Sequence, residues 1–131
     1  TEKIQMTENE ISKIIVDSAI EVHKTLGGPG LLESVYEESL AWELKAKGLQ
    51  IKRQMEVPIK YKGNLLASPL NLDLLVNDLV IVEVKSVIIY NSIFEAQTLT
   101  YLRLMNVKLG LVINFGEKRV VNGVHRVVNG L

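Results

Sequence analysis

The strongest constraint on the fold is a pair of apolar runs separated by one amphipathic helix. Residues 79–85 read LVIVEVK, a β-prone run that predicts a strand. Residues 107–115 read VKLGLVINF and predict a second, central strand. Between them we expect a helix from Ser92 to Asn106, opened by the capping-box pattern Ser92-x-x-Glu95. Such a unit closes by a right-handed crossover, so the two strands should be parallel or nearly so.

The remaining apolar patterns place helices before this unit and further strands on either side of it. A first helix is predicted over residues 7–26, opened by the capping box Thr7–Glu10, and a second over residues 31–47, ended by Gly48. Strands are predicted over residues 50–61, 65–76 and 120–128, with turns at residues 62–64 and 77–78. The chain therefore predicts an α/β fold bordering on α+β, in which helices flank a mixed sheet.

Two local features qualify the predicted strands. Pro69 cannot donate a hydrogen bond to a ladder, so the first half of the strand over residues 65–76 should be an edge or irregular. Asn122-Gly123 is a dipeptide typical of two-residue hairpin loops, and it predicts a type I′ turn within residues 120–128.

Size and composition favour one globular domain over residues 1–131. The absence of cysteine fits a reducing compartment, so we expect a cytoplasmic protein, and the polar N-terminal residues give no sign of an export signal. Membrane insertion is not expected, because no apolar run approaches the length that spans a bilayer. With no cysteine and two histidines, any metal should be held by oxygen atoms, which favours Mg²⁺ or Mn²⁺.

The charge balance argues against broad electrostatic capture of a polyanion. Fifteen basic and fifteen acidic residues cancel. Strong non-specific binding of nucleic acid usually requires a basic balance or a basic stripe. The lysines and arginines near the predicted strands are therefore interpreted as solvated positions.

Three charged residues stand in segments that are otherwise built to be buried: Asp73, Glu83 and Lys85. Glu83 and Lys85 are two apart on a strand, so they share one face of it. If the turn at residues 77–78 closes a hairpin, Asp73 lies on the neighbouring strand, roughly level with residues 82–84. Two carboxylates and one ammonium would then converge.

That set suits metal-assisted hydrolysis of a phosphodiester. Asp73 and Glu83 would hold a hard divalent cation, and the backbone carbonyl of Val84 could be a further ligand. The cation would lower the pKa of a bound water, which Lys85 would orient or help to deprotonate. The alternative is an ordinary Glu83–Lys85 ion pair on a half-hydrated face of the sheet.

Two helical features accompany these residues. Gln97 and Tyr101 are four apart in the helix after Lys85, so they share a face. The alternative is a core stripe with Gln97 at its margin. Glu33 stands in the first turn of a predicted helix, where a carboxylate also compensates the helix dipole.

Several separated motifs, in order, resemble a known family. Residues 30–36, GLLESVY, match the GxxExxY signature that names a family of small bacterial and archaeal proteins. The likeness continues through residues 73–76, 81–85, 95–101 and 110–116, and covers nearly the whole chain from about Ile11. That family is similar to the PD-(D/E)xK nuclease superfamily. The resemblance implies a restriction-endonuclease-like αβββαβ core, here with an extra N-terminal helix.

The resemblance also implies a role for each matching residue. Asp73 and Glu83 would be the metal-binding acids, and Lys85 the catalytic lysine. Three helical residues would assist them: Glu33, which would join the metal site through water, and Gln97 and Tyr101, which resemble a QxxxY element that orients the lysine or the substrate phosphate.

Three positions depart from the family pattern. Asn71 stands where an arginine is frequent, Ile88 where an acid is frequent, and Phe94 where a histidine is frequent. The acid–acid–lysine set is intact, while three polar groups around it are replaced by neutral or apolar ones.

Three functional hypotheses follow. The leading one is a metal-dependent nuclease-like protein that hydrolyses phosphodiester bonds of DNA or RNA. The second is a catalytically inactive binding module that keeps the fold, which the neutral charge and the three departures favour. The third is a homo-oligomer, favoured by a mean hydropathy of +0.19 and by apolar strands near a sheet edge in residues 120–128. The expected partners are accordingly nucleic acid and further copies of the chain.

Overall fold

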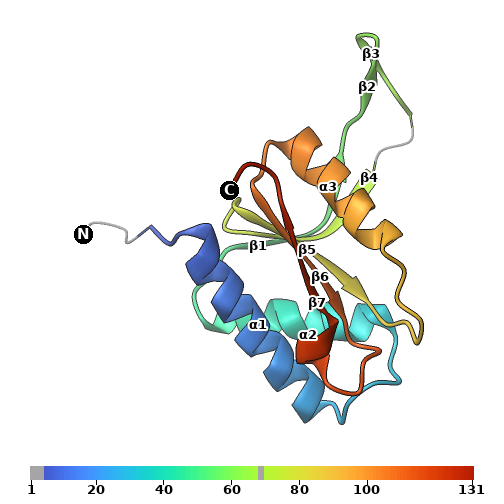
Figure 1. Ribbon diagram of the computed structural model, residues 1–131. Coiled ribbons are helices and arrows are strands. Elements are labelled where there is room, and N and C mark those ends of the chain that lie inside the picture. The colour runs from blue at the N-terminus through green and yellow to red at the C-terminus, as the bar shows by residue number, and fades with distance from the viewer. Residues whose placement is uncertain (1–4, 68–69) are drawn as a thin grey trace.

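A mixed five-stranded sheet with helices on both faces forms the core of the computed structural model, which describes residues 5–67 and 70–131 (Figure 1). The strands lie in the order β1 (Ile51–Val57), β4 (Leu70–Val76), β5 (Val80–Lys85), β6 (Leu109–Asn114) and β7 (Val124–Val128). Strands β5 and β6 are parallel, and all other neighbours in this sheet are antiparallel. The predicted parallel crossover and the predicted fold class are both confirmed.

Helices α1 (Glu8–Thr25) and α2 (Glu33–Ala46) cover one face of the sheet, and α3 (Ile93–Met105) covers the other (Figure 1). Helix α1 begins as predicted, with reciprocal hydrogen bonds of 3.2 Å between Thr7 and Glu10. Helix α2 begins two residues later than predicted, after a loop in which Gly28 and Gly30 have φ of 94° and 115°. Among the described helices, none is both long and apolar enough to cross a membrane.

Strand β5 is buried on both faces, and its alternation decides where the charged residues point. Val82 and Val84 join the core beneath α1 and α2, whereas Ile81 joins the core beneath α3. Because successive side chains alternate, Glu83 and Lys85 lie on the α3 side together with Ile81. The two charged residues therefore share a face, as their spacing predicts.

The prediction of a single strand over residues 50–61 is wrong. Strand β1 ends at Val57, before Pro58, because proline lacks the N–H group that a ladder requires. The chain continues into a separate hairpin of β2 (Lys60–Tyr61) and β3 (Asn64–Leu65), which projects away from the sheet (Figure 1). The predicted turn at residues 62–64 joins these strands. The prediction made from Pro69 concerns a residue outside the described part of the chain.

The predicted type I′ hairpin at Asn122-Gly123 is also wrong. Residues Val120–Gly123 form a short 3₁₀ helix, η1, immediately before β7. Val120 is buried in the core beneath α1, and a Cβ on Gly123 would lie 2.4 Å from the carbonyl oxygen of Asn114. Packing of this segment against β6 therefore overrides the local turn preference.

The capping box predicted at Ser92 does not form. Ser92 has helical backbone angles, φ −61° and ψ −11°, and its side chain makes no cap bond within the described residues. The side chain of Asn91 takes that role, because its Oδ1 accepts a hydrogen bond from the Ile93 N–H at 2.9 Å.

Helix α3 packs so closely on β6 that a Cβ on Gly110 would lie 2.7 Å from Cγ2 of Thr98. We expect Gly110→Ala to lower the free energy of unfolding by about 1–3 kcal/mol through overpacking. Thr98→Ser removes that methyl group and keeps the hydroxyl, which donates to the Phe94 carbonyl at 2.8 Å. Urea denaturation of the double variant should therefore show most of the loss regained. If the stability loss of the double variant equals the sum of the losses of the two single variants, this packing is contradicted.

Candidate functional site

The candidate site begins where strands β4 and β5 separate. Their ladder joins residues 74–76 to residues 80–82. Beyond the last ladder pair, Oδ2 of the Asp73 carboxylate accepts a hydrogen bond from the Val84 N–H at 2.8 Å. A side chain thus takes the place of a ladder carbonyl, and Asp73 lies where the register predicted it, beside residues 83 and 84.

The backbone of Val84 borders the same opening. In a strand, the N–H and C=O groups of one residue point toward the same neighbouring strand. The carbonyl of Val84 therefore faces β4, beside Asp73. The following residue points the other way, since the Lys85 carbonyl accepts a hydrogen bond from the Phe115 N–H at 2.8 Å.

Glu83 is buried at this opening with an unsatisfied oxygen. The residue is 6% exposed, and among the described residues its Oε1 has no hydrogen-bond partner. Burial, followed by the negative charge of Asp73, raises the pKa of Glu83 to about 9, while Lys85 acts in the opposite direction. Such a pair of carboxyl groups is unfavourable unless a proton or a cation lies between them.

Lys85 is held beside an aromatic ring. Its Nζ lies 4.6 Å from the centroid of the Phe94 ring, which belongs to α3. Phe94 packs edge-on against Tyr90, with ring centroids 5.5 Å apart. The apolar residue at position 94 therefore supplies a cation–π contact that positions the ammonium group.

Tyr101, on α3, lies near enough to the two acids for their charges to act on its phenol. Burial, followed by the charges of Glu83 and Asp73, raises the pKa of its phenol. Gln97, one turn earlier on α3, is exposed. The role that the resemblance implies for Gln97 stays a prediction.

Glu33 is exposed in the first turn of α2. It borders an open hollow whose lining also includes Ser86, the residue after Lys85. The structure therefore places Glu33 at the same end of the sheet as Lys85. Its implied link to a metal through water stays a prediction.

Glu37 is an acid near the site that sequence analysis missed. It is buried on α2, and its Oε2 accepts hydrogen bonds of 3.0 and 3.2 Å from the guanidinium of Arg53. Its Oε1 accepts a bond of 2.7 Å from Nε2 of Gln54, and the same amide nitrogen lies 3.2 Å from Oδ1 of Asp73. Gln54 joins the two carboxylates while its backbone has φ 48°, a region that residues other than glycine rarely adopt.

One signal in the sequence could have identified Glu37. It falls on the apolar stripe of α2 together with Leu40 and Leu44, three and seven residues later, and an acid on a buried stripe must be paired. Burial raises the pKa of Glu37, and the charge of Asp73 raises it further, against the opposing hydrogen bond from Arg53. Its partners lie on β1, which no local pattern places beside α2.

The oxygen atoms at the opening fit a hard divalent cation. The described residues contain no group of three or more His, Cys, Asp or Glu side chains arranged to hold a metal. Asp73, Glu83 and the Val84 carbonyl are nevertheless oxygen donors of the kind that Mg²⁺ and Mn²⁺ accept when water completes the coordination. The unpartnered Oε1 of Glu83 is the observation that favours a cation here.

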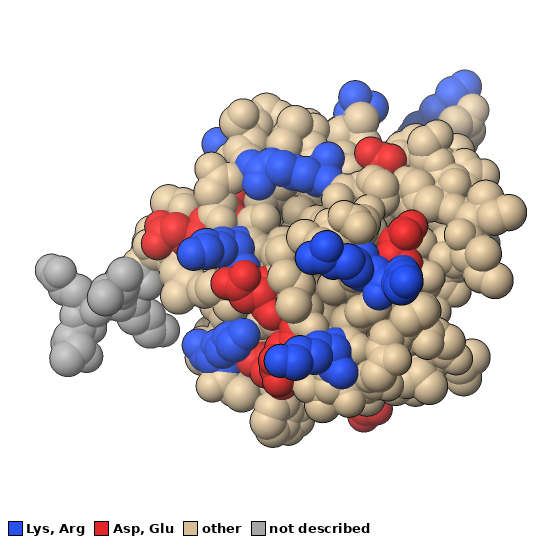
Figure 2. Space-filling model, turned by 60° about the horizontal axis from the view of Figure 1, so that its bottom comes forward, with Lys and Arg blue, Asp and Glu red and all other residues tan. Residues whose placement is uncertain are grey.

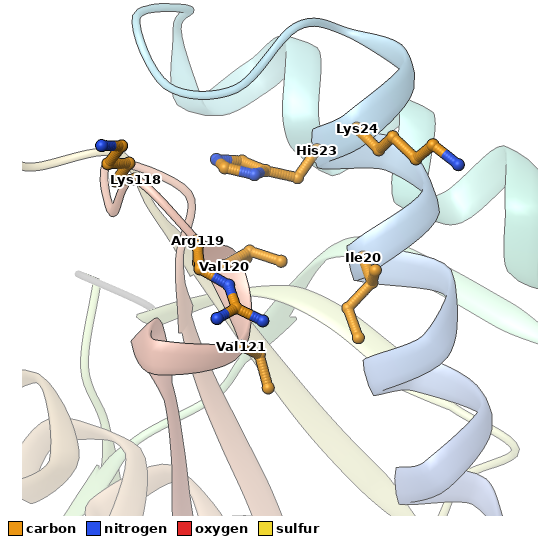
Figure 3. Close-up of a pocket in the computed structure, with 7 residues that line it drawn as sticks. All are labelled: Ile20, His23, Lys24, Lys118, Arg119, Val120 and Val121. Atoms are coloured by element: carbon orange, nitrogen blue, oxygen red, sulfur yellow. The ribbon is translucent and has the colours of Figure 1, made fainter.

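A cavity of about 290 Å³ lies elsewhere, between α1 and the segment after β6 (Figure 3). Apolar and basic side chains line it: Ile20, His23, Lys24, Lys118, Arg119, Val120 and Val121. Figure 3 shows the ammonium group of Lys24 pointing away from the cavity. Because these lining residues include no carboxylate, the cavity is not a candidate for the divalent ion.

The sheet order, the parallel crossover through α3 and the acids at the β4–β5 opening define a restriction-endonuclease-like domain. A family model described as the PD-(D/E)XK nuclease superfamily matches residues 9–127. The chain belongs to this superfamily, whose members generally use divalent metals and act on nucleic acid. Comparisons with curated proteins and with solved structures give no match.

The raised pKa of Glu83 predicts how stability depends on pH when no divalent ion is bound. The ordinary pKa is 4.5 and the folded value is about 9. Between them, the folded state holds a proton that the unfolded state has released, so the free energy of unfolding should fall as the pH rises. Glu83→Gln cannot ionise, so it should flatten this dependence and stabilise the protein by about 1–3 kcal/mol near neutral pH.

Thermal melts in EDTA measure this dependence, with Glu56→Gln, an exposed change on β1, as the control. A wild-type melting temperature that stays level between about pH 5 and pH 9 would show that Glu83 is ionised in the folded state.

Proposed function

We propose that this protein binds Mg²⁺ or Mn²⁺ through Asp73, Glu83 and the Val84 carbonyl, and that it hydrolyses phosphodiester bonds of DNA or RNA. One observation carries the proposal. Asp73 reaches across the sheet opening to the Val84 N–H, while the buried Oε1 of Glu83 beside it has no partner among the described residues. The (D/E)XK pattern in the superfamily's name occurs here as Glu83-Val84-Lys85.

The side chains at the opening would have distinct parts in the reaction. When bound, the cation would stabilise charge on the phosphate and lower the pKa of water. Lys85, on the same face as Glu83, would orient the attacking water or stabilise negative charge on the phosphate. Asp73 is already fixed by the Val84 N–H, so its carboxylate would need little rearrangement.

The helical residues would act on the substrate side of the site. The raised pKa of Tyr101 keeps its phenol protonated, so that it can donate a hydrogen bond to a phosphate oxygen. Gln97 would present its amide to the substrate or to Lys85, and Glu33 would accept a hydrogen bond from a water at the metal.

We also propose that the chain is a member of the GxxExxY group. Tyr36 is fully buried and stacks on Phe115 with ring centroids 4.6 Å apart. Its hydroxyl donates to the Gly28 carbonyl at 2.7 Å and accepts from the Leu31 N–H at 3.2 Å. The signature thus ties the glycine-rich loop to α2, and Ser86 ties the same loop to the end of β5 through a bond of 2.8 Å to the Leu31 carbonyl.

The surface charge favours a few local contacts with nucleic acid over broad capture. The net charge is zero. Figure 2 shows Lys and Arg side chains interspersed with Asp and Glu on the face that it presents. Binding would therefore depend on groups near the opening, and its affinity should fall less steeply with salt than that of a strongly basic protein.

A non-catalytic binding module, as a monomer or a homo-oligomer, is a second candidate. The observation that favours it is that the described residues offer no third acid or histidine for a metal at the opening. The cytoplasmic location expected from the absence of cysteine suits both candidates. Binding of a divalent ion and turnover distinguish them.

We expect calorimetry to detect Mn²⁺ binding at millimolar or lower concentrations, and gel assays with labelled DNA and RNA strands to detect cleavage. Lys85→Ala should keep the melting temperature and the Mn²⁺ affinity but lower cleavage by about 100-fold or more, because it removes a charge that acts on the reacting groups. Lys13→Ala changes an exposed lysine on α1 and is the matched control. A protein that binds no divalent ion in the millimolar range would exclude the metal-dependent enzyme.

Glu37 should influence the metal without touching it. Glu37→Ala removes one acceptor of the Gln54 amide and so frees Asp73, and we expect the Mn²⁺ affinity to fall by about 10-fold or more. Glu38→Ala, an exposed change on the same helix, should leave the affinity unchanged. Equal affinities in the two variants would show that the Gln54 bridge does not position Asp73.

A further inference from the structure

The loop that follows Lys85 presents two isoleucines to solvent. Ile88 is 96% exposed and Ile89 is 85% exposed, although they follow a strand, β5, whose residues are largely buried. They stand three and four residues after Lys85, at the carboxyl end of β5. Large apolar side chains that project singly are common, but an adjacent pair beside a candidate site marks a contact surface.

The first end of this loop is rigidly anchored on β6. The side chain of Asn114, which pairs with Lys85 in the sheet, accepts a hydrogen bond from the Val87 N–H and donates one to the Val87 carbonyl, both at 3.0 Å. Gly116 lies so close that a Cβ there would be 2.2 Å from the Val87 carbonyl oxygen. The backbone just before Ile88 is therefore held on two sides.

The second end is anchored by Tyr90. Its ring stacks on the ring of His125, with centroids 3.9 Å apart and planes 9° apart. Its hydroxyl donates to the Glu95 carboxylate at 3.2 Å. Because Val87 and Tyr90 are both fixed, Ile88 and Ile89 form a stiff tip whose position relative to Lys85 is set by the sheet.

We propose that Ile88 and Ile89 act as an apolar wedge that enters the base stack of a nucleic acid beside the phosphate held at the opening. The inference rests on the proposed function for the position of that phosphate. Apolar side chains inserted between bases unstack them and kink the strand, and one or two side chains suffice. The substrate would then be nucleic acid that is single-stranded, mismatched or nicked near the scissile bond, because unstacking is easiest there.

The size of the tip favours nucleobases over a second protein surface. A stable protein interface buries about 800 Å² on each partner, far more than two side chains provide. The neighbouring Asn91 and Ser92 are polar and exposed, and they separate the tip from Ile93, which is 48% exposed at the start of α3. A stiff, narrow apolar tip matches a base step.

The test measures unstacking directly. DNA duplexes that carry 2-aminopurine at successive positions, with and without a mismatch, are titrated with the Lys85→Ala protein, which should bind without cleaving. We expect the fluorescence to rise severalfold at one position. Adding Ile88→Ser and Ile89→Ser should abolish the rise and weaken duplex binding by about 5- to 100-fold, because the apolar contact of two isoleucine side chains with the bases is lost. Binding to the mismatched duplex should weaken more, because less of the contact energy is spent on unstacking there.

Two controls separate the wedge from general effects. Ile88→Leu with Ile89→Leu keeps the apolar tip and should keep the fluorescence rise. Trp42→Gln removes a side chain that is 67% exposed on α2, under the opposite face of the sheet, and should change neither fluorescence nor affinity. The serine substitutions lie at exposed positions and should leave the melting temperature unchanged.

The outcomes separate this inference from the proposed function. A fluorescence rise in a protein that never cleaves with Mg²⁺ or Mn²⁺ supports the wedge and overturns the nuclease. Cleavage by the wild type with an unchanged signal in the serine variant overturns the wedge alone. The wedge is also overturned if the protein binds no nucleic acid, or if sedimentation shows a dimer that the serine substitutions dissociate.

Discussion

The site depends on one side-chain hydrogen bond that replaces a backbone hydrogen bond between strands β4 and β5. Because Asp73 Oδ2 accepts the Val84 N–H at 2.8 Å, strands β4 and β5 stop pairing as a ladder at the point where Glu83 and Lys85 begin. If the ladder continued, the Val84 carbonyl would accept a backbone hydrogen bond from β4, and no opening would exist. Glu37 and Arg53 hold the far side of the opening through Gln54, so the carboxylate of Asp73 is fixed from two directions.

This arrangement is unfavourable by itself, and the surrounding core has to stabilise it. Like charges and burial disfavour ionisation of Glu83, and its Oε1 is unsatisfied among the described residues. Apart from Asn71, the other residues of β4 and β5 are apolar, and every residue of β6 is buried. Folded proteins tolerate such local conflicts at functional sites when consistent packing elsewhere supplies the stability.

The remaining functional features lie at the carboxyl ends of the two parallel strands, β5 and β6. The glycine-rich loop before α2, the loop with Ile88 and Ile89, and the segment after β6 meet there through bonds to Leu31, Val87 and Phe115. Parallel strands bring such ends to one edge, where loops can approach a shared ligand. Phe94 and Tyr90 connect the candidate lysine to the isoleucine tip, so positioning of both depends on one aromatic cluster.

The sequence by itself determined the parallel β5–α3–β6 unit and the shared face of Glu83 and Lys85, because periodicity and residue spacing are local properties. It also placed Asp73 correctly, because a short turn limits the possible register. Only the tertiary structure decided that Val120–Gly123 is helical and that Glu37 stands behind Asp73. Those outcomes depend on packing between segments distant along the chain, and such contacts leave no periodic trace in the residues that make them.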